Sequence, residues 1–144
     1  MLADPVHTVE LYNRIKSRGI AQSIFRKALL AAYNGKCSFC GLGIKVVLEG
    51  AHIVSWTKST AGMRVNVQNG LLLCATHHKM FDNRLLTVSD EYVIQLSVKE
   101  AKRILKPDQL VISKLVGKKI LLPVLPIHCP SSEYLDKHRM KVVS

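Results

Sequence analysis

From Ile20 to Ala32, apolar residues recur every three to four positions, which is the spacing of one face of a helix. The Asn34–Gly35 pair that follows is a typical helix stop. Residues 1–19 show only weak periodicity. The pattern therefore predicts an N-terminal tether over residues 1–19 and one folded domain over residues 20–144.

Short apolar runs separated by turns fill the rest of the chain. We expect strands at residues 44–49, 85–88, 92–98 and 120–122, a loop at 58–69, and helices at 75–83, 107–116 and after Pro130. The last helix would begin at a serine cap. The sequence thus predicts a mixture of helices and short strands without internal repeats.

Composition limits the class of protein. The 144 residues are 48% hydrophobic, which suits one domain with its own core and excludes a wholly disordered chain. The longest apolar stretch, Ile120–Ile127, is too short to span a membrane and contains two prolines. The first ten residues lack the basic start and apolar run of a signal peptide. We therefore expect a cytoplasmic protein without a membrane partner.

The chain is strongly basic. It has 21 Lys and Arg against 10 Asp and Glu, a net charge of +11. Residues 97–144 alone hold ten basic and four acidic residues. A field of this sign favours polyanions, with nucleic acid first among them. The alternative is a solvated basic face.

Two pairs of metal-ligand residues stand 33 residues apart. Cys37 and Cys40 form a CxxC pair, and Cys74 and His77 form a CxxH pair. Each pair can supply two ligands from one tight turn, and thiolates with one imidazole favour a structural zinc ion. A redox CxxC would leave the CxxH pair unexplained. Cys129 stands outside this pattern, as a plain thiol or a further candidate ligand.

A second group of polar residues overlaps the first. His52 ends a strand-like segment, Asn69 precedes an apolar run, and His78 follows Asn69 by nine residues. If residues 75–83 are helical, His78 and Asp82 share a face of the helix, while His77 points elsewhere. The segment would then carry a structural metal site on one side and an open metal site on the other.

Three stretches resemble the HNH nucleases, in the branch with zinc knuckles found in restriction enzymes. They are FRKALLAAYNGKCSFCG, LEGAHIVSW and NGLLLCATHHKMFD, and the tail with GKKILLPV and PSSEYLDKH is also similar. The resemblance covers residues 20–140. It implies an α+β fold with a ββα-metal core, a structural zinc site and flanking helices. In that core, two strands carry the first His and the Asn, and a helix carries the last His.

The resemblance also implies roles for the polar residues. His52 would be the general base that activates water, and Asn69 would hold the loop and orient His52. His78 would bind the catalytic divalent ion, Mg²⁺ or another, and Asp82 stands one helical turn on, where relatives can place a further ligand. Lys79 and Arg84 are candidates for phosphate contacts, with solvated charge at a helix end as the alternative.

Ala51 departs from the family pattern. Many members have Asp or His directly before the first His, as a metal ligand, so one ligand is missing here unless Asp82 takes over. Glu49 is the nearest carboxylate, but in an extended segment Glu49 and His52 point to opposite faces.

The implied activity is metal-dependent hydrolysis of DNA, with the chain as the cleavage module of a restriction or defence system. A separate specificity domain or a second copy would be its partner. Two alternatives stay open. One is a zinc-stabilised nucleic-acid-binding module with little or no cleavage, which Ala51 favours. The other is an RNA-cleaving nuclease with the same site chemistry.

Overall fold

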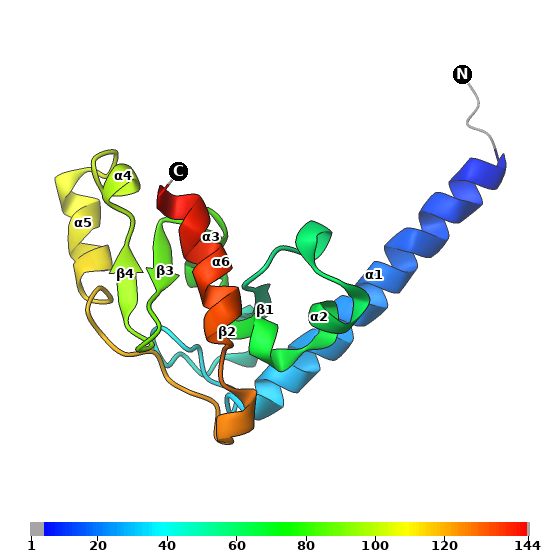
Figure 1. Cartoon of the computed structure of the whole chain (residues 1–144), viewed down its shortest axis with the longest axis horizontal. Coiled ribbons are helices and arrows are strands. Elements are labelled where there is room, and N and C mark those ends of the chain that lie inside the picture. The colour runs from blue at the N-terminus through cyan, green and yellow to red at the C-terminus, as the bar shows by residue number, and fades with distance from the viewer. Residues whose placement is uncertain (1–4, 144) are drawn as a thin grey trace.

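The computed structural model describes residues 5–143 and shows a mixed fold of helices and short strands (Figure 1). Its helices are α1 (Pro5–Ala32), α2 (Ala61–Val65), α3 (Ala75–Asp82), α4 (Val98–Ala101), α5 (Lys106–Ser113) and α6 (Ser132–Val143). Its strands are β1 (Leu48–His52), β2 (Gly70–Cys74), β3 (Leu86–Val88) and β4 (Ile94–Leu96). The expected α+β class is confirmed.

The centre of the fold is the antiparallel pair β1–β2. The register places Leu48 opposite Cys74 at one end of the pair and His52 opposite Gly70 at the other. Helix α3 follows β2 directly. Strand, strand and helix therefore occur in the order that the ββα resemblance implies. Strands β3 and β4 form a separate antiparallel pair.

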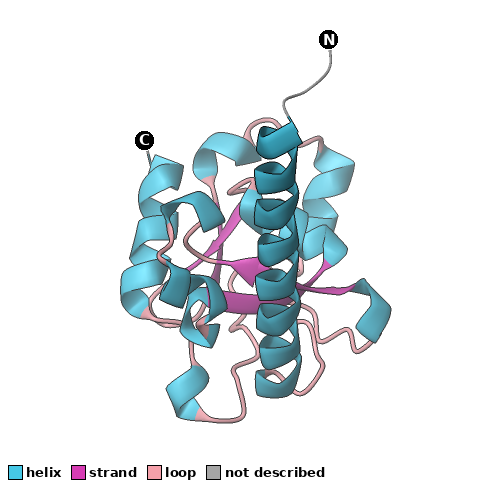
Figure 2. Cartoon of the chain, turned by 90° about the vertical axis from the view of Figure 1, so that its right-hand side faces the viewer, coloured by secondary structure: helices cyan, strands magenta, loops and turns pink. Residues whose placement is uncertain are grey.

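Helix α1 lies across the β1–β2 pair (Figure 2). Phe25 and Leu29 of this helix are fully buried. They approach β2 at Gly70, where a Cβ atom would meet the Phe25 ring at 2.4 Å. The absence of a side chain at Gly70 is thus what allows the helix to pack so close. The N-terminal half of α1 extends beyond the rest of the fold (Figure 1).

One apolar cluster joins the elements. It contains α1, β1, β2 and α3, and it continues to β3, β4 and the C-terminal helix α6. Its fully buried members include Phe25, Leu72, Phe81, Ile94 and Leu135. Burial of side chains of this size stabilises a fold by about 1.5–3 kcal/mol each. The cluster holds the hairpin and α3 in fixed relative positions.

Several element predictions need correction. The first helix begins at Pro5 instead of Ile20, and residues 1–4 lie outside the described part of the chain. The strand expected from residue 44 begins only at Leu48, after a 3-10 turn, and the loop expected at 58–69 contains α2. Residues 120–122 are not a strand, and the isolated bridge between Val93 and Lys119 lies just before them.

The helices expected at 75–83 and after Pro130 are confirmed as α3 and α6, and the one expected at 107–116 as α5. The division into a tether and a domain stays a prediction. None of the helices in the described residues is long and apolar enough to cross a membrane.

Candidate functional site

The four residues of the CxxC and CxxH pairs meet in space. Their ligand atoms all lie within 4.8 Å of one another. Cys74 Sγ is 3.2 Å and Cys37 Sγ is 3.7 Å from His77 Nδ1. Sulfur atoms bound about 2.3 Å from one tetrahedral ion lie about 3.8 Å apart, so three thiols and one imidazole in this arrangement fit a zinc ion. Cys129 is not part of the cluster.

Backbone geometry forms the turn that presents the first two thiols. Gly41 adopts a φ of 76°, in the left-handed region that favours glycine. Its N–H donates to the Cys37 carbonyl at 2.8 Å. Burial opposes ionisation of Cys37, but hydrogen bonds from His77 and from backbone N–H groups outweigh it and lower the pKa of this thiol to about 6. These contacts favour a thiolate at Cys37, the form that binds metal, whereas burial raises the pKa of Cys40 to about 12.

The His52 ring is held on three sides. One face stacks on Phe25 with a centroid distance of 4.0 Å, and Trp56 approaches edge-on at 5.9 Å. Its Nε2 lies 2.8 Å from the carbonyl oxygen of Arg64. Burial lowers the pKa of His52 below 6.5, and the Arg64 carbonyl only partly offsets this. At neutral pH the ring is therefore an uncharged imidazole in a fixed orientation.

Asn69 is fully buried and bonds the segment between β1 and β2. Its Oδ1 accepts from the Val54 N–H at 2.9 Å. Its Nδ2 donates to the Met63 carbonyl at 3.1 Å and to Ser59 Oγ at 3.3 Å. Since Arg64, which binds His52, follows Met63 directly, Asn69 acts on His52 through this loop. That Asn69 orients His52 stays a prediction, for which this loop is the physical route.

His78 lies between two carboxylates. Its Nδ1 is 2.7 Å from Glu49 Oε1, and its Nε2 is 3.1 Å from Asp82 Oδ2. Burial lowers the pKa of His78, but hydrogen bonds to Asp82 and Glu49 outweigh that effect and raise it above 6.5. His78 and Asp82 lie one helical turn apart on α3, as predicted.

A hollow of about 390 Å³ connects these residues. His52, His78, Asp82 and Arg84 all line it. Arg84 adopts a φ of 57°, which is rare for a residue with a side chain, and its Nε is buried without a hydrogen-bond partner. The predicted Lys79 does not line this hollow; it is exposed and borders a different one.

Sequence reasoning assigned no role to Glu49 or to Arg64. Glu49 faces away from His52, as expected, yet it reaches His78 from the neighbouring strand. The sequence shows a carboxylate three residues before the candidate base. Its contact with His78, however, depends on how α3 packs against β1. Arg64 gave no signal, because its backbone carbonyl binds His52. Ala51 is fully buried and supplies no ligand.

Comparisons with known proteins agree with this geometry. Residues 37–89 match the family model described as HNH endonuclease. A solved structure described as "Modification dependent TagI restriction endonuclease" is similar to this chain, with a TM-score of 0.55 and 22% sequence identity. The alignment covers 81% of this chain and 36% of that chain, and at this identity it concerns the fold. No match was found among curated proteins.

The region matched by the family model contains both pairs of metal-ligand residues and the residues that surround the 390 Å³ hollow, apart from those of α1 and α6. The expected resemblance is therefore confirmed for this region: residues 37–89 match the HNH endonuclease family, a family of nucleases.

Proposed function

We propose that this chain is a metal-dependent DNA endonuclease in which His52 is the general base. The observation that carries the proposal is the contact between His52 Nε2 and the Arg64 carbonyl. A carbonyl oxygen only accepts hydrogen bonds, so Nε2 carries the ring hydrogen and Nδ1 keeps a lone pair. Since burial lowers the pKa of His52, this lone pair is available at neutral pH to take a proton from water.

His78 and Asp82 would hold the catalytic divalent ion. Their donor atoms are 3.1 Å apart. Two ligands at right angles on an ion bound at about 2.1 Å lie roughly 3 Å apart, so the observed distance fits such an ion. Glu49 accepts from His78 Nδ1 and thereby fixes the ring with Nε2 toward Asp82. When bound, such an ion would polarise the phosphate and stabilise the leaving oxygen. Arg84, which lines the same hollow, would contact the same phosphate.

Cys37, Cys40, Cys74 and His77 would bind a structural zinc ion. Cys37 and Cys74 are buried within the apolar cluster, and Cys74 is the N-cap residue directly before α3. An ion there would tie the CxxC turn to β2 and to the start of the helix that carries His78. Metal binding would then be part of the folding free energy.

The buried Ala51 favours a second candidate function, a nucleic-acid-binding module with weak or no cleavage. A side chain at this position could have supplied a third ligand, and alanine cannot. On our proposal, Asp82 takes that place, because it already lies beside His78.

The chain spans 36% of the length of the TagI structure that it resembles. We therefore propose that it acts as the cleavage module of a restriction or defence system, with a separate specificity domain or a second copy as partner. Its basic charge supplies binding to the DNA backbone but no reading of sequence.

Digestion of a supercoiled plasmid with a panel of divalent ions tests the proposal. The wild-type chain should nick the plasmid only with added divalent ion. The His52→Ala variant should lose roughly 10²–10⁴-fold in rate, the usual contribution of a positioned base. The matched control is His7→Ala, which removes an exposed histidine of α1 and should cut as wild type.

DNA binding of each variant is measured beside its cleavage. Wild-type binding without nicking under any ion would support the inactive module instead. Cleavage of RNA in preference to DNA would show that the substrate is wrong. Full activity of His52→Ala would exclude His52 as the base.

A further inference from the structure

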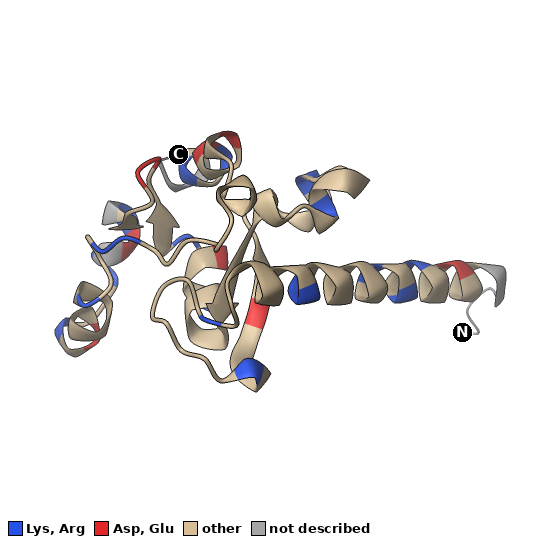
Figure 3. Ribbon diagram, turned by 90° about the horizontal axis from the view of Figure 1, so that it is seen from below, with Lys and Arg blue, Asp and Glu red and all other residues tan. Residues whose placement is uncertain are grey.

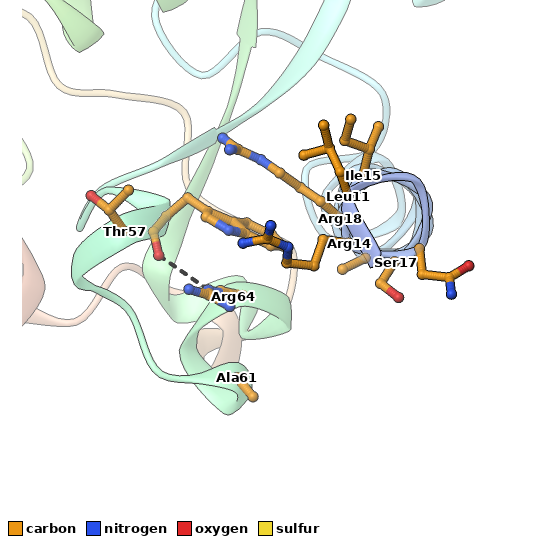
Figure 4. Close-up of a pocket in the computed structure, with 11 residues that line it drawn as sticks. Leu11, Arg14, Ile15, Ser17, Arg18, Thr57, Ala61 and Arg64 are labelled. Carbon is orange, nitrogen blue, oxygen red and sulfur yellow. Dashed lines mark hydrogen bonds between the residues drawn. The ribbon is translucent and has the colours of Figure 1, made fainter. Parts of the chain in front are cut away.

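A second hollow, with a volume of about 850 Å³, lies beside the site between α1 and the segment that contains α2. We call it the arginine groove and define it by Leu11, Arg14, Ile15, Arg18, Trp56 and Arg64, which line it. Figure 4 shows Arg14 and Arg18 reaching from α1, and Arg64 from α2, into the space between the two helices. None of the side chains proposed above to accept a proton, bind a metal ion or contact the cleaved phosphate lines this groove.

The charge of the groove has one sign. Among the described residues that line it, every ionisable one is an arginine. Lys and Arg also recur along the length of α1 (Figure 3). Arginine is the side chain best suited to phosphate, because its guanidinium group can donate two parallel hydrogen bonds. The groove therefore complements a polyanion.

Trp56 holds two of the arginines in place. The guanidinium carbon of Arg64 lies 4.3 Å and that of Arg18 lies 4.9 Å from the centre of the Trp56 ring. Arg64 Nε also donates to the Trp56 carbonyl at 3.1 Å. Stacking uses the face of a guanidinium group and leaves N–H groups at its edge to bind a ligand. The groove is thus organised before any ligand arrives.

The groove is continuous with the catalytic site. Arg18 and Trp56 line both the arginine groove and the hollow that contains His52. Arg64 joins them a second time, because its side chain lies in the groove while its carbonyl oxygen binds the His52 ring. A polymer with phosphates at regular intervals can therefore occupy both hollows at once.

We infer that the arginine groove binds the backbone of the cleaved DNA strand, next to the phosphate that is cut. The inference rests on the proposed nuclease function. Arg14, Arg18 and Arg64 contact flanking phosphates, and Leu11 and Ile15 present apolar surface to the sugars. Contacts of this kind position the strand without reading its sequence.

Fluorescence anisotropy with a labelled DNA duplex tests the inference. Binding is measured without added divalent ion and in the His52→Ala background, so that no strand is cut. The test variant carries Arg14→Gln and Arg18→Gln. The control carries Lys106→Gln and Lys114→Gln, two exposed positions on and after α5 that lose the same charge.

Each phosphate contact contributes about −0.9 to the slope of log K against log salt concentration. The arginine variant should bind more weakly, with a slope reduced by about two units, while the lysine control keeps the wild-type slope. Equal losses in both variants would show only an effect of net charge and would overturn the inference. Unchanged binding by the arginine variant would overturn it as well.

Two further outcomes are informative. A wild-type chain that binds through these arginines but nicks no plasmid would contradict the nuclease proposal, while DNA binding by the groove would still be supported. The alternative occupant of the groove is a second copy of the chain. If sedimentation shows a dimer that Ile15→Glu dissociates, while the arginine variant binds DNA as wild type, the groove is a protein interface and our inference is wrong.

Discussion

Substitution of Gly70 by alanine probes how α1 and the site are packed together. A Cβ atom at Gly70 would lie 2.4 Å from Phe25 Cζ and 3.0 Å from Leu29 Cδ1. Ordinary contacts of this kind start near 3.4 Å, so the Phe25 ring has to move by about 1 Å. The ring cannot withdraw freely, because it is fully buried and stacks on His52 at 4.0 Å.

We expect Gly70→Ala to lower the free energy of unfolding by about 1–3 kcal/mol, the usual cost of overpacking a core. Urea denaturation followed by circular dichroism measures it. Gly62→Ala is the matched control, because Gly62 lies in the exposed helix α2 and a Cβ there meets nothing within 4 Å. That change should be neutral or stabilise the fold by up to about 1 kcal/mol.

A double-mutant cycle with Phe25→Leu separates this clash from other causes. A smaller side chain at position 25 should recover part of the loss, so the two changes together should cost less than the sum of the single changes. Additive costs would show that the clash is not the reason. A Gly70→Ala variant as stable as wild type would refute the packing argument altogether.

Three further predictions concern metals and protons. Cys40→Ser should lose bound zinc and unfold the domain, whereas Cys129→Ser should keep both zinc and stability, as elemental analysis and circular dichroism would show. At saturating Mg²⁺, which removes the competition between the metal and a proton at His78, cleavage should rise with pH through a midpoint below 6.5 and then level off, because burial lowers the pKa of His52 and only the neutral ring accepts a proton. A midpoint above 6.5 in that pH–rate profile would contradict this. Glu49→Gln should weaken Mg²⁺ binding about 10–100-fold in a calorimetric titration and leave zinc content unchanged, because Glu49 orients His78; equal affinity would remove that role.

Local spacing in the sequence was sufficient to predict much of the site. Ligands three residues apart, as in the CxxC and CxxH pairs, are placed by one turn of backbone, and His78 and Asp82 are placed by one turn of helix. These distances depend little on the rest of the fold. The contact between Glu49 and His78 was not predictable in this way, because it depends on how α3 packs against β1.

The helical start at Pro5 was missed for a related reason. Val9, Tyr12 and Ile15 are more than half exposed, so no buried face imposes a period on this part of α1. Helix α2 was missed because it has only five residues, although Thr60 accepts a capping hydrogen bond from the Met63 N–H at 3.3 Å. Short helices depend on caps and tertiary contacts more than on periodicity.

The register of β1 and β2 also limits where the length of this chain can change. Side chains alternate between the two faces of a strand, so one inserted residue in β2 would turn over everything between the insertion and Cys74. The pairing of Leu48 with Cys74 and of His52 with Gly70 could then not hold at both ends. Residues 55–58 are restricted for another reason, because Trp56 contacts the His52 ring edge-on and stacks on Arg18 and Arg64. Insertions and deletions should therefore be excluded from both strands and from this stretch, so a peptide tag placed at either position would disturb the site.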